Sequence, residues 1–276
     1  MGPYLTLARD VAATLWPVAA VFVMLALATK RGAAPAAALR CRREAMTNAG
    51  LVVVNYILLA PLMIVPVLAV RAVLPVHPGL AESWESLPEI ALLALAIALI
   101  EFAAYWRHRF EHDPALWRFH ATHHADEELH WLSVLRKHPV SKFLEMLIDS
   151  LPVLLLGFPA WSIVAAQLLR SWWGYFIHAD VPWTLGPAGN LLMSPAAHRL
   201  HHIRDEALMG SNYGNMLTVW DRLFGTWRDP APHLGCATGI AEGTRGVWGE
   251  LKRPWEARYR GAARGEALPP LPSART

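Results

Sequence analysis

The chain has 276 residues, of which 54% are hydrophobic and only 17% charged. Long uncharged runs favour a membrane protein over a soluble enzyme. The only two cysteines, Cys41 and Cys236, exclude a disulfide framework. The net charge is only +3 and no nucleic-acid motif is present, so no nucleic-acid partner is expected.

Three apolar segments are predicted to cross a membrane. Residues 11–29 and 49–70 carry no charge and are long enough to span about 30 Å of hydrocarbon. Pro61 and Pro66 are expected to kink the second of them. Residues 72–87 are expected to form a loop, and the third segment, 90–106, leads directly into a histidine-rich region.

The distribution of Lys and Arg predicts the orientation of these segments. Residues 30–48 contain five, residues 72–87 contain none and residues 107–142 contain six. The positive-inside rule then places the first and third of these regions in the cytoplasm. The histidines that follow the third segment are therefore expected on the cytoplasmic side of a multi-pass membrane protein.

Glu101 is the one charge inside the third apolar segment. It lies seven residues before His108 and eleven before His112, on the same helical stripe. An ionisable residue at membrane depth suggests a function. We consider two interpretations: a carboxylate that reaches to the membrane interface, and a carboxylate that orients a metal-bound imidazole through its second nitrogen.

Eight histidines fall into three closely spaced motifs, one HxxxH and two HxxHH. Asp113–Pro114 and Ser194–Pro195 provide helix-start signals beside them. Helical residues three and four apart share a face, so each motif presents several imidazoles together. The motif histidines are His108 and His112; His120, His123 and His124; and His198, His201 and His202.

This number of imidazoles indicates two metal ions. Imidazole binds iron, zinc, copper and nickel, and eight rings are too many for one four-coordinate zinc site. His178 follows an apolar, aromatic run and is a further predicted ligand. Its buried imidazole would be costly to leave without a partner.

The region between the second and third motifs is predicted to be a hairpin. Residues 150–169 contain no charge and could form one spanning helix. One span would place the third motif on the opposite side of the membrane from the other two. We therefore expect residues 143–178 to turn back at Gly157-Phe158-Pro159, because proline breaks a helix.

The predicted fold is an all-α integral membrane protein with three spanning helices, a deep helical hairpin and a cytoplasmic helical cap that carries the dimetal site. Residues 1–88 would supply membrane helices and loops, and residues 89–250 the catalytic region of the same domain. Residues 211–227 are expected to pack against the histidine helices. Residues 251–276 are interpreted as a disordered tail.

The motifs between about 101 and 227 resemble those of the fatty acid hydroxylase/sterol desaturase superfamily. They include Tyr105-Trp106-Arg107-His108, Arg136-x-His138-Pro139, Phe176-x-His178-Ala179, Asn212-Tyr213-Gly214 and Trp220-Asp221-Arg222-Leu223-Phe224-Gly225-Thr226. The resemblance implies a membrane di-iron enzyme that uses O2 to hydroxylate or desaturate a sterol, fatty acyl or related isoprenoid lipid.

The resemblance also assigns site residues. The eight motif histidines match the family's iron ligands, and His178 and His138 match its additional ligands. Asp180 stands where the family often has Asn, so it becomes a candidate partner of a ligand ring. Ser141 stands where the family often has Glu. Zinc can replace iron in an isolated sample, since imidazole accepts both.

No flavin or nicotinamide motif is present, so electrons are expected from a separate ferredoxin- or cytochrome-like protein. A histidine-rich metal transporter or metal-binding protein is the alternative. A transporter would place its ligands near the bilayer midplane on broken helices, whereas these histidines lie beyond the apolar runs. A haem carrier would need only one pair of axial histidines.

Overall fold

The structure is a computed structural model that describes residues 3–73 and 78–262. These residues form helices joined by loops, with no β-strand among them. The N-terminal elements are α1 (Pro3–Lys30), η1 (Arg31–Ala33), α2 (Ala34–Arg40), α3 (Arg42–Val52), the π-helix η2 (Val53–Leu58), α4 (Ala60–Val73) and α5 (Pro78–Glu85). The central elements are α6 (Glu89–Glu111), α7 (Pro114–His124), η3 (Trp131–Leu135), α8 (Pro139–Ile148), α9 (Leu151–Leu155) and α10 (Ala160–Ile177). The C-terminal elements are η4 (Gly186–Asn190), α11 (Pro195–His201), α12 (Glu206–Met209), α13 (Val219–Leu223), η5 (Ala231–His233), α14 (Val247–Lys252), η6 (Arg253–Trp255) and α15 (Ala257–Ala262). The all-α prediction is therefore confirmed for these residues.

Two helical segments are long and apolar enough to cross a membrane, by length and composition: Tyr4–Arg40 and Glu89–Glu111. They contain the first and third predicted spans. The second predicted span, 49–70, is not one regular helix, because the π-helix η2 and a bend at Leu59 separate α3 from α4. Pro61 lies two residues later and has no N–H with which to continue the helical ladder.

The expected loop at 72–87 contains the helix α5, while residues 74–77 lie outside the described part. Tertiary packing holds this short helix. The Trp84 indole donates to the Leu156 carbonyl oxygen at 2.8 Å, and its ring lies 4.5 Å from that of Phe158. The loop prediction was wrong here because these contacts come from a region distant in the sequence.

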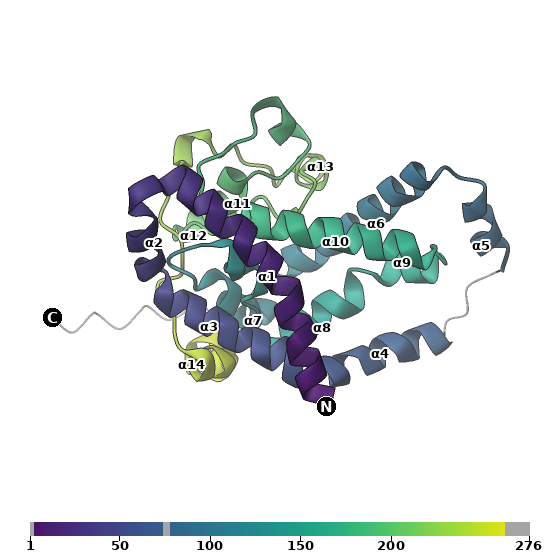
Figure 1. The fold of residues 1–276 in the computed structure, drawn as a ribbon, viewed down its shortest axis with the longest axis horizontal. Helices are drawn as coiled ribbons and strands as arrows, with labels where there is room; N and C mark the ends of the chain where they lie inside the picture. The colour runs from purple at the N-terminus through teal and green to yellow at the C-terminus, as the bar shows by residue number, and fades with distance from the viewer. Residues whose placement is uncertain (1–2, 74–77, 263–276) are drawn as a thin grey trace.

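The chain reverses direction between α9 and α10. Gly157 adopts a positive φ of 69°, and α10 begins after Pro159. Figure 1 shows α6 and α10 both running from the end that carries α5 toward the end that carries α7 and α11, which we call the histidine end. Helices α6 and α10 also pack against each other. This break positions the C-terminal ends of both helices beside α7 and α11.

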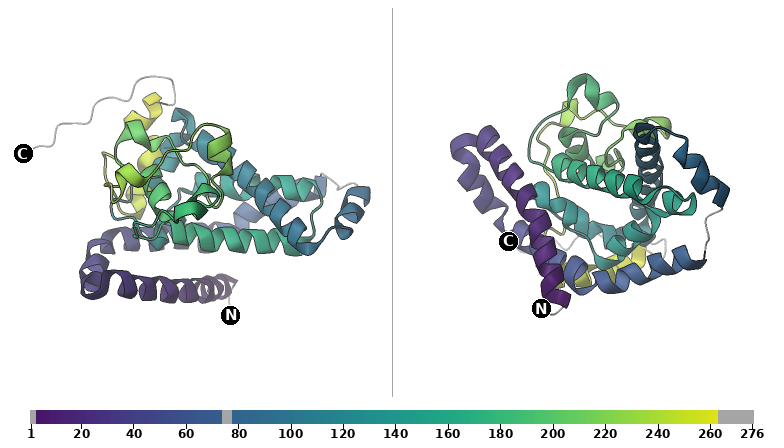
Figure 2. Two further views of the ribbon diagram at one scale, coloured as in Figure 1. Left: turned by 90° about the horizontal axis from the view of Figure 1, so that it is seen from above. Right: turned by 45° about the vertical axis from the view of Figure 1, so that its right-hand side comes forward.

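Helix α1 covers one side of this helical core, as the views in Figure 2 show. Its Phe22 ring stacks on Trp131 at a centroid distance of 5.8 Å. At the C-terminal end of α1, Lys30 Nζ lies 2.5 Å from Asp180 Oδ2. Asp180 follows His178 by only two residues. The N-terminal helices therefore share a hydrophobic core with the rest of the chain.

The packed structure continues past residue 250, so the interpretation of 251–276 as a disordered tail does not hold for residues 251–262. Arg253 and Tyr259 are almost completely buried, and Arg253 contacts the carboxylate of Glu250. This network includes Arg136, whose guanidinium also donates to Glu250 at 2.5 Å. Composition indicated disorder, but buried ion pairs order the segment. Residues 263–276 lie outside the described part.

Candidate metal centre

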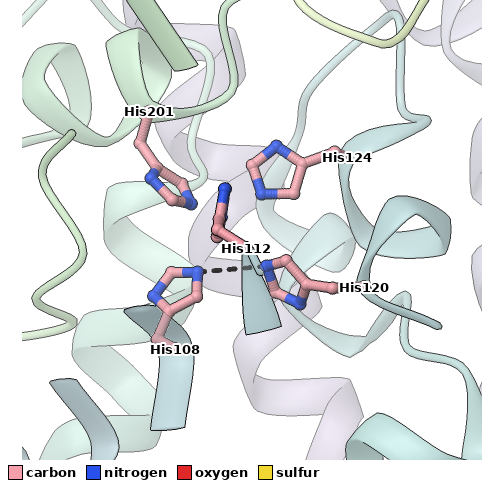
Figure 3. Close-up of side chains that lie close together, drawn as sticks. All are labelled: His108, His112, His120, His124 and His201. Carbon is pink, nitrogen blue, oxygen red and sulfur yellow. Dashed lines mark hydrogen bonds between the residues drawn. The ribbon is translucent and has the colours of Figure 1, made fainter. Parts of the chain in front are cut away.

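Nine of the ten predicted ligand histidines converge in two neighbouring groups, and the candidate ligand atoms within each group lie within 4.8 Å of one another. The first group comes from the C-terminal end of α6, from α7 and from α11, and Figure 3 shows its rings turned toward a common centre. The second comes from α7, the C-terminal end of α10 and α11. The first group is His108, His112, His120, His124 and His201; the second is His123, His178, His198 and His202.

Capping side chains fix where α7 and α11, the two helices that carry the HxxHH motifs, begin. Asp113 Oδ1 accepts a hydrogen bond from the Ala115 N–H at 3.1 Å at the start of α7. Ser194 Oγ accepts one from the Ala197 N–H at 3.1 Å at the start of α11. Both predicted helix caps are therefore confirmed, and each fixes the first turn of a histidine-bearing helix.

Each of the two HxxHH motifs contributes histidines to both groups. On α7, His120 and His124 belong to the first group and His123 to the second. On α11 the division is reversed, with His201 in the first group and the other two histidines in the second. Consecutive helical residues are rotated by about 100°, so the last two histidines of a motif cannot point at one centre.

Backbone carbonyls orient four of these rings. The Nδ1 atoms of His108, His178 and His201 each lie 2.7 Å from a carbonyl oxygen, and that of His123 lies 3.2 Å from the Arg136 oxygen. A carbonyl oxygen only accepts hydrogen bonds, so Nδ1 must carry the proton in each neutral ring. The Nε2 lone pair is then directed into the group.

These lone pairs face one another at short range. His108 Nε2 lies 3.1 Å from His120 Nε2, the contact that is dashed in Figure 3. His178 Nε2 lies 3.4 Å from His123 Nε2 and 3.0 Å from His198 Nε2. Two nitrogen ligands at right angles, each about 2.1 Å from a metal ion, would be about 3.0 Å apart. The separation therefore fits a shared cation.

Other ring nitrogens in the groups have no hydrogen-bond partner among the described residues. These buried atoms are Nε2 of His112 and His201, Nδ1 of His198, and both nitrogens of His124 and His202. An unpaired buried polar atom is costly unless a ligand satisfies it. The donor set and its unpaired atoms therefore fit metal ions.

Burial also keeps the rings in the form that binds metal. It lowers the pKa of His178 to about 3 and that of His201 to about 4. The pKa of His124 and His202 is likewise lowered well below its usual value, first by burial and then by neighbouring histidines. Neutral imidazole is the ligating form, so the apoprotein holds the rings ready for metal at neutral pH.

The sequence analysis did not identify Glu111 as a site residue. Its buried carboxylate lies 3.5 Å from His120 Nδ1 and also pairs with Arg107. A carboxylate behind a ligand histidine fixes the orientation of the ring and raises its basicity. The only signal was its position within the HxxxH motif, directly before His112.

Residues 211–217, which we call loop 211–217, supply two of the orienting carbonyls, those of Ser211 and Tyr213. The buried Asp221 carboxylate holds this loop by accepting from the N–H groups of Tyr213 at 2.7 Å and Gly214 at 2.8 Å. A Cβ on Gly214 would lie 2.3 Å from the Leu217 oxygen, so the position requires glycine. The expected packing of 211–227 against the histidine helices is confirmed.

Glu101 is buried, with 1% of its surface exposed, which contradicts a carboxylate that reaches to the interface. It accepts from Arg170 Nε at 2.5 Å and from the backbone N–H groups of Met216 and Leu217. Among its described contacts none is an imidazole. Glu101 therefore braces loop 211–217, and it acts on the ligand rings through the backbone rather than directly.

Two further predicted site residues lie outside the histidine groups. His138 Nδ1 accepts from the Val140 N–H, and its Nε2 lies 3.3 Å from the Leu251 oxygen. Asp180 pairs with Lys30 and Arg199, with no ligand ring among its described contacts. The expected roles of His138 as a ligand and Asp180 as an orienting partner therefore find no support in these contacts.

A cavity of about 510 Å³ leads to the histidines. Its inner end is formed by rings of both groups, including His108, His123 and His178, which are largely buried. Its outer end is lined by side chains of α1 and α10, among them the exposed Leu168 and Trp172. The site is thus reached from the apolar surface of the helices.

We expect Asp221→Asn to lower metal affinity or turnover by roughly 10–100-fold, the usual effect of losing a group that orients a metal ligand. The amide would present N–H donors to a loop that needs acceptors, and His108 would lose its fixed carbonyl partner. Iron titration and turnover measure the effect, and circular dichroism checks the fold. The exposed Asp229, which caps Ala231, provides the matched control Asp229→Asn. Unchanged affinity and turnover in Asp221→Asn would contradict this role.

A comparison with known protein families matches the part of the chain that carries both histidine groups. Residues 93–226 match the model of a family described as fatty acid hydroxylase, and this range includes both histidine groups and Asp221. No solved structure shows a significant match to the chain.

Three similar proteins act on different lipids, by their names. An ornithine lipid hydroxylase of Rhizobium tropici is 29% identical over 65% of this chain and 54% of its own length. The alkylglycerol monooxygenase of Homo sapiens is 34% identical over 46% of this chain and 28% of its own. A Delta(7)-sterol 5(6)-desaturase of Candida albicans is 29% identical over 62% of this chain and 42% of its own. The match therefore covers about half or less of each relative.

Proposed function

We propose that this chain, whose residues 93–226 match the fatty acid hydroxylase family model, is a membrane di-iron oxygenase that uses O2 to hydroxylate or desaturate a lipid. The observation that supports it most is the set of facing Nε2 atoms, 3.0 to 3.4 Å apart, at the inner end of a cavity lined by apolar helices. The similar proteins are a lipid hydroxylase, a monooxygenase and a desaturase by name.

The first histidine group would hold one iron ion and the second group the other. His138 is not in the ligand set that we propose, since both of its ring nitrogens contact other groups. When bound, iron held by imidazoles can activate O2 and so supply the oxidant that a C–H bond requires. Zinc also accepts imidazole and is expected to compete for the site in an overproduced sample.

The chain's own residues position the lipid and exclude water. Apolar side chains of α1, including Val11, Leu15 and Val18, line the cavity on the side opposite the metal site's core helices. They let an apolar chain approach without crossing water. Carbonyl-bound Nδ1 protons hold the ligand rings in one tautomer. Electrons would come from a separate ferredoxin- or cytochrome-like protein.

The metal-transporter alternative fits the geometry less well. A transporter would hold metal at discontinuous helices near the bilayer midplane. Here the ligands gather at the C-terminal ends of α6 and α10 and on the short helices α7 and α11. This arrangement suits a reaction centre at the membrane surface.

O2-dependent lipid oxidation tests the proposed function. We expect the iron-loaded protein, given a reduced ferredoxin and extracted membrane lipids, to incorporate ¹⁸O from ¹⁸O2 into a lipid or to introduce a double bond. Lipid mass spectrometry detects either product. Omission of O2 or chelation of iron should remove both. If iron-loaded, reduced protein oxidises no lipid from its native membrane, the proposal is wrong.

The proposed topology places the histidine end in the cytoplasm and α5 on the other side. Residue 31 follows Lys30, which pairs with Asp180 at the histidine end, and residue 261 lies in α15, which packs against α7. The test places single cysteines at positions 31, 82 and 261 in a variant that lacks Cys41 and Cys236. Their labelling in intact cells should differ. A membrane-impermeant thiol reagent should label position 82 only. Labelling at 261 would refute the hairpin of α8 to α10.

A further inference from the structure

The polar wall of the cavity carries an unusual arrangement of charges on α8 and on the residues directly before it. Lys137, Lys142 and Glu145 all line the cavity. Lys142 Nζ lies 2.5 Å from one carboxylate oxygen of Glu145, and Lys137 Nζ pairs with the other oxygen. Their side chains are only 11 to 22% exposed. Two ammonium groups therefore share one carboxylate.

The other cations of the cavity are fully engaged. Arg107 uses three nitrogens on the carboxylates of Asp149 and Glu111. Arg170 donates to Glu101 and Gln167 and lies 3.5 Å from Asp149. These two arginines face three carboxylates, so their N–H donors are occupied by structural partners.

The lysines, by contrast, keep donors for a ligand. Each ammonium carries three N–H donors, and Glu145 accepts from each of the two lysines. Lys142 also lies 4.7 Å from the centre of the Tyr56 ring and hydrogen-bonds to the Tyr56 side chain, which occupies a second of its three donors. The remaining donors line a cavity rather than bulk solvent, so they call for an acceptor-rich group inside it.

Lysine is rare in this sequence, yet two lysines line the cavity. The whole chain contains only four lysines, Lys30, Lys137, Lys142 and Lys252, against many arginines. The fully buried ion pairs in the described part of the chain use arginine, as at Arg136 and Arg253. Lys137 lines the same cavity as the ligand rings of His123 and His198. Two of the four lysines thus line the path to the metal site.

We propose that Lys137 and Lys142 anchor an anionic group, a carboxylate or a phosphate, on the lipid that enters this cavity. This inference rests on the proposed function and specifies its substrate class. The apolar side chains of α1 would contact the hydrocarbon part of the lipid, and the two ammonium groups its charged end. Charge-assisted hydrogen bonds of this kind are about twice as strong as neutral ones, so they select an anionic lipid over an uncharged one of equal length.

Competition binding to the iron-loaded protein in a neutral detergent tests this anchor. The probes share one C18 chain: oleate and oleoyl lysophosphatidate are anionic, and oleyl alcohol and monooleoylglycerol are uncharged. We expect at least one anionic probe to bind roughly tenfold or more tightly than its uncharged counterpart, as charged partners allow. Comparing oleate with lysophosphatidate identifies which anion the site takes. Equal affinity for all four would overturn the inference.

Variants separate the anchor from general electrostatics. Lys142→Met and Lys137→Met should remove the preference for the anionic probe and leave the affinity for the uncharged probes unchanged. Lys142→Arg should keep much of the preference. Lys252→Met, at an exposed position on α14, is the matched control and should behave like the wild type. An intact preference in both methionine variants, or an equal loss in Lys252→Met, would refute the anchor.

The same samples distinguish failure of the anchor from failure of the proposed function. Each probe is also assayed for oxidation with ¹⁸O2 and reduced ferredoxin. Oxidation of anionic and uncharged probes alike, with equal binding, would exclude the anchor and leave the oxygenase intact. A lysine-dependent preference in binding without oxidation of any probe or of native lipid would support the anchor and exclude the oxygenase.

Discussion

Replacing His201 or His123 by Ala is expected to abolish turnover and to lower the iron content of the purified protein. His201 belongs to the first histidine group and His123 to the second, so each substitution damages a different site. The wild-type chain should hold two iron ions, one in each group, and each variant should retain fewer. Iron per chain is measured by mass spectrometry on the purified protein, and turnover by lipid oxidation.

His138→Ala is the matched control for these two variants. Its ring lies outside both groups and accepts the Val140 N–H at the start of α8. Its loss should therefore cost about 0.5–2 kcal/mol of stability, as for other helix caps, and leave the iron content unchanged. Full activity in His123→Ala or His201→Ala, or an active metal-free protein, would exclude the metal site. Equal iron loss in His138→Ala would show that the proposed ligand set is incomplete.

Replacing Glu250 by Ala is expected to lower the free energy of unfolding by about 3–5 kcal/mol, the usual effect of breaking a buried ion pair. Glu250 is completely buried and accepts from Arg136 at 2.5 Å and from Arg253 at 2.8 Å. Its removal takes the closest carboxylate from two buried guanidinium groups, and Arg136 then keeps only the carboxylate of Asp126, at 3.6 Å. Denaturant or thermal unfolding in detergent, followed by circular dichroism, measures the change.

The Glu250 variant should also disturb the second histidine group. The Arg136 carbonyl oxygen accepts the Nδ1 proton of His123, so movement of Arg136 changes the orientation of that ring. Glu256→Ala is the control, because Glu256 forms a more exposed pair with Arg245 that should contribute only about 0–1 kcal/mol. If both variants unfold alike, the buried network does not stabilise the fold as we infer.

Local sequence determined the features that depend on neighbouring residues. Asp113 and Ser194 predicted the starts of α7 and α11, because a side-chain cap acts within three residues of itself. Gly157 and Pro159 predicted the helix break before α10, because their backbone preferences do not depend on distant contacts. The histidine spacings predicted which rings share a helix, and nine of the ten predicted ligands lie in the two groups.

Contacts between distant segments decided the role of Glu101 and the order of the residues after 250. The partners of Glu101 are the Arg170 side chain and the backbone of loop 211–217, more than sixty residues away, so its role as a brace was not predictable from the stripe it shares with His108. The buried network around Glu250 ordered residues that composition assigned to a tail.

By itself, the sequence determined that this protein is helical and carries three histidine motifs on neighbouring helices, since helix caps and residue spacing act locally. Only the tertiary structure decided how those histidines divide into two groups. A helix fixes the rotation of about 100° between His123 and His124, but not which neighbour each ring faces. That choice follows from the packing of α6, α10 and α11 around α7, which brings His112 and His201 to one side and His178 and His202 to the other.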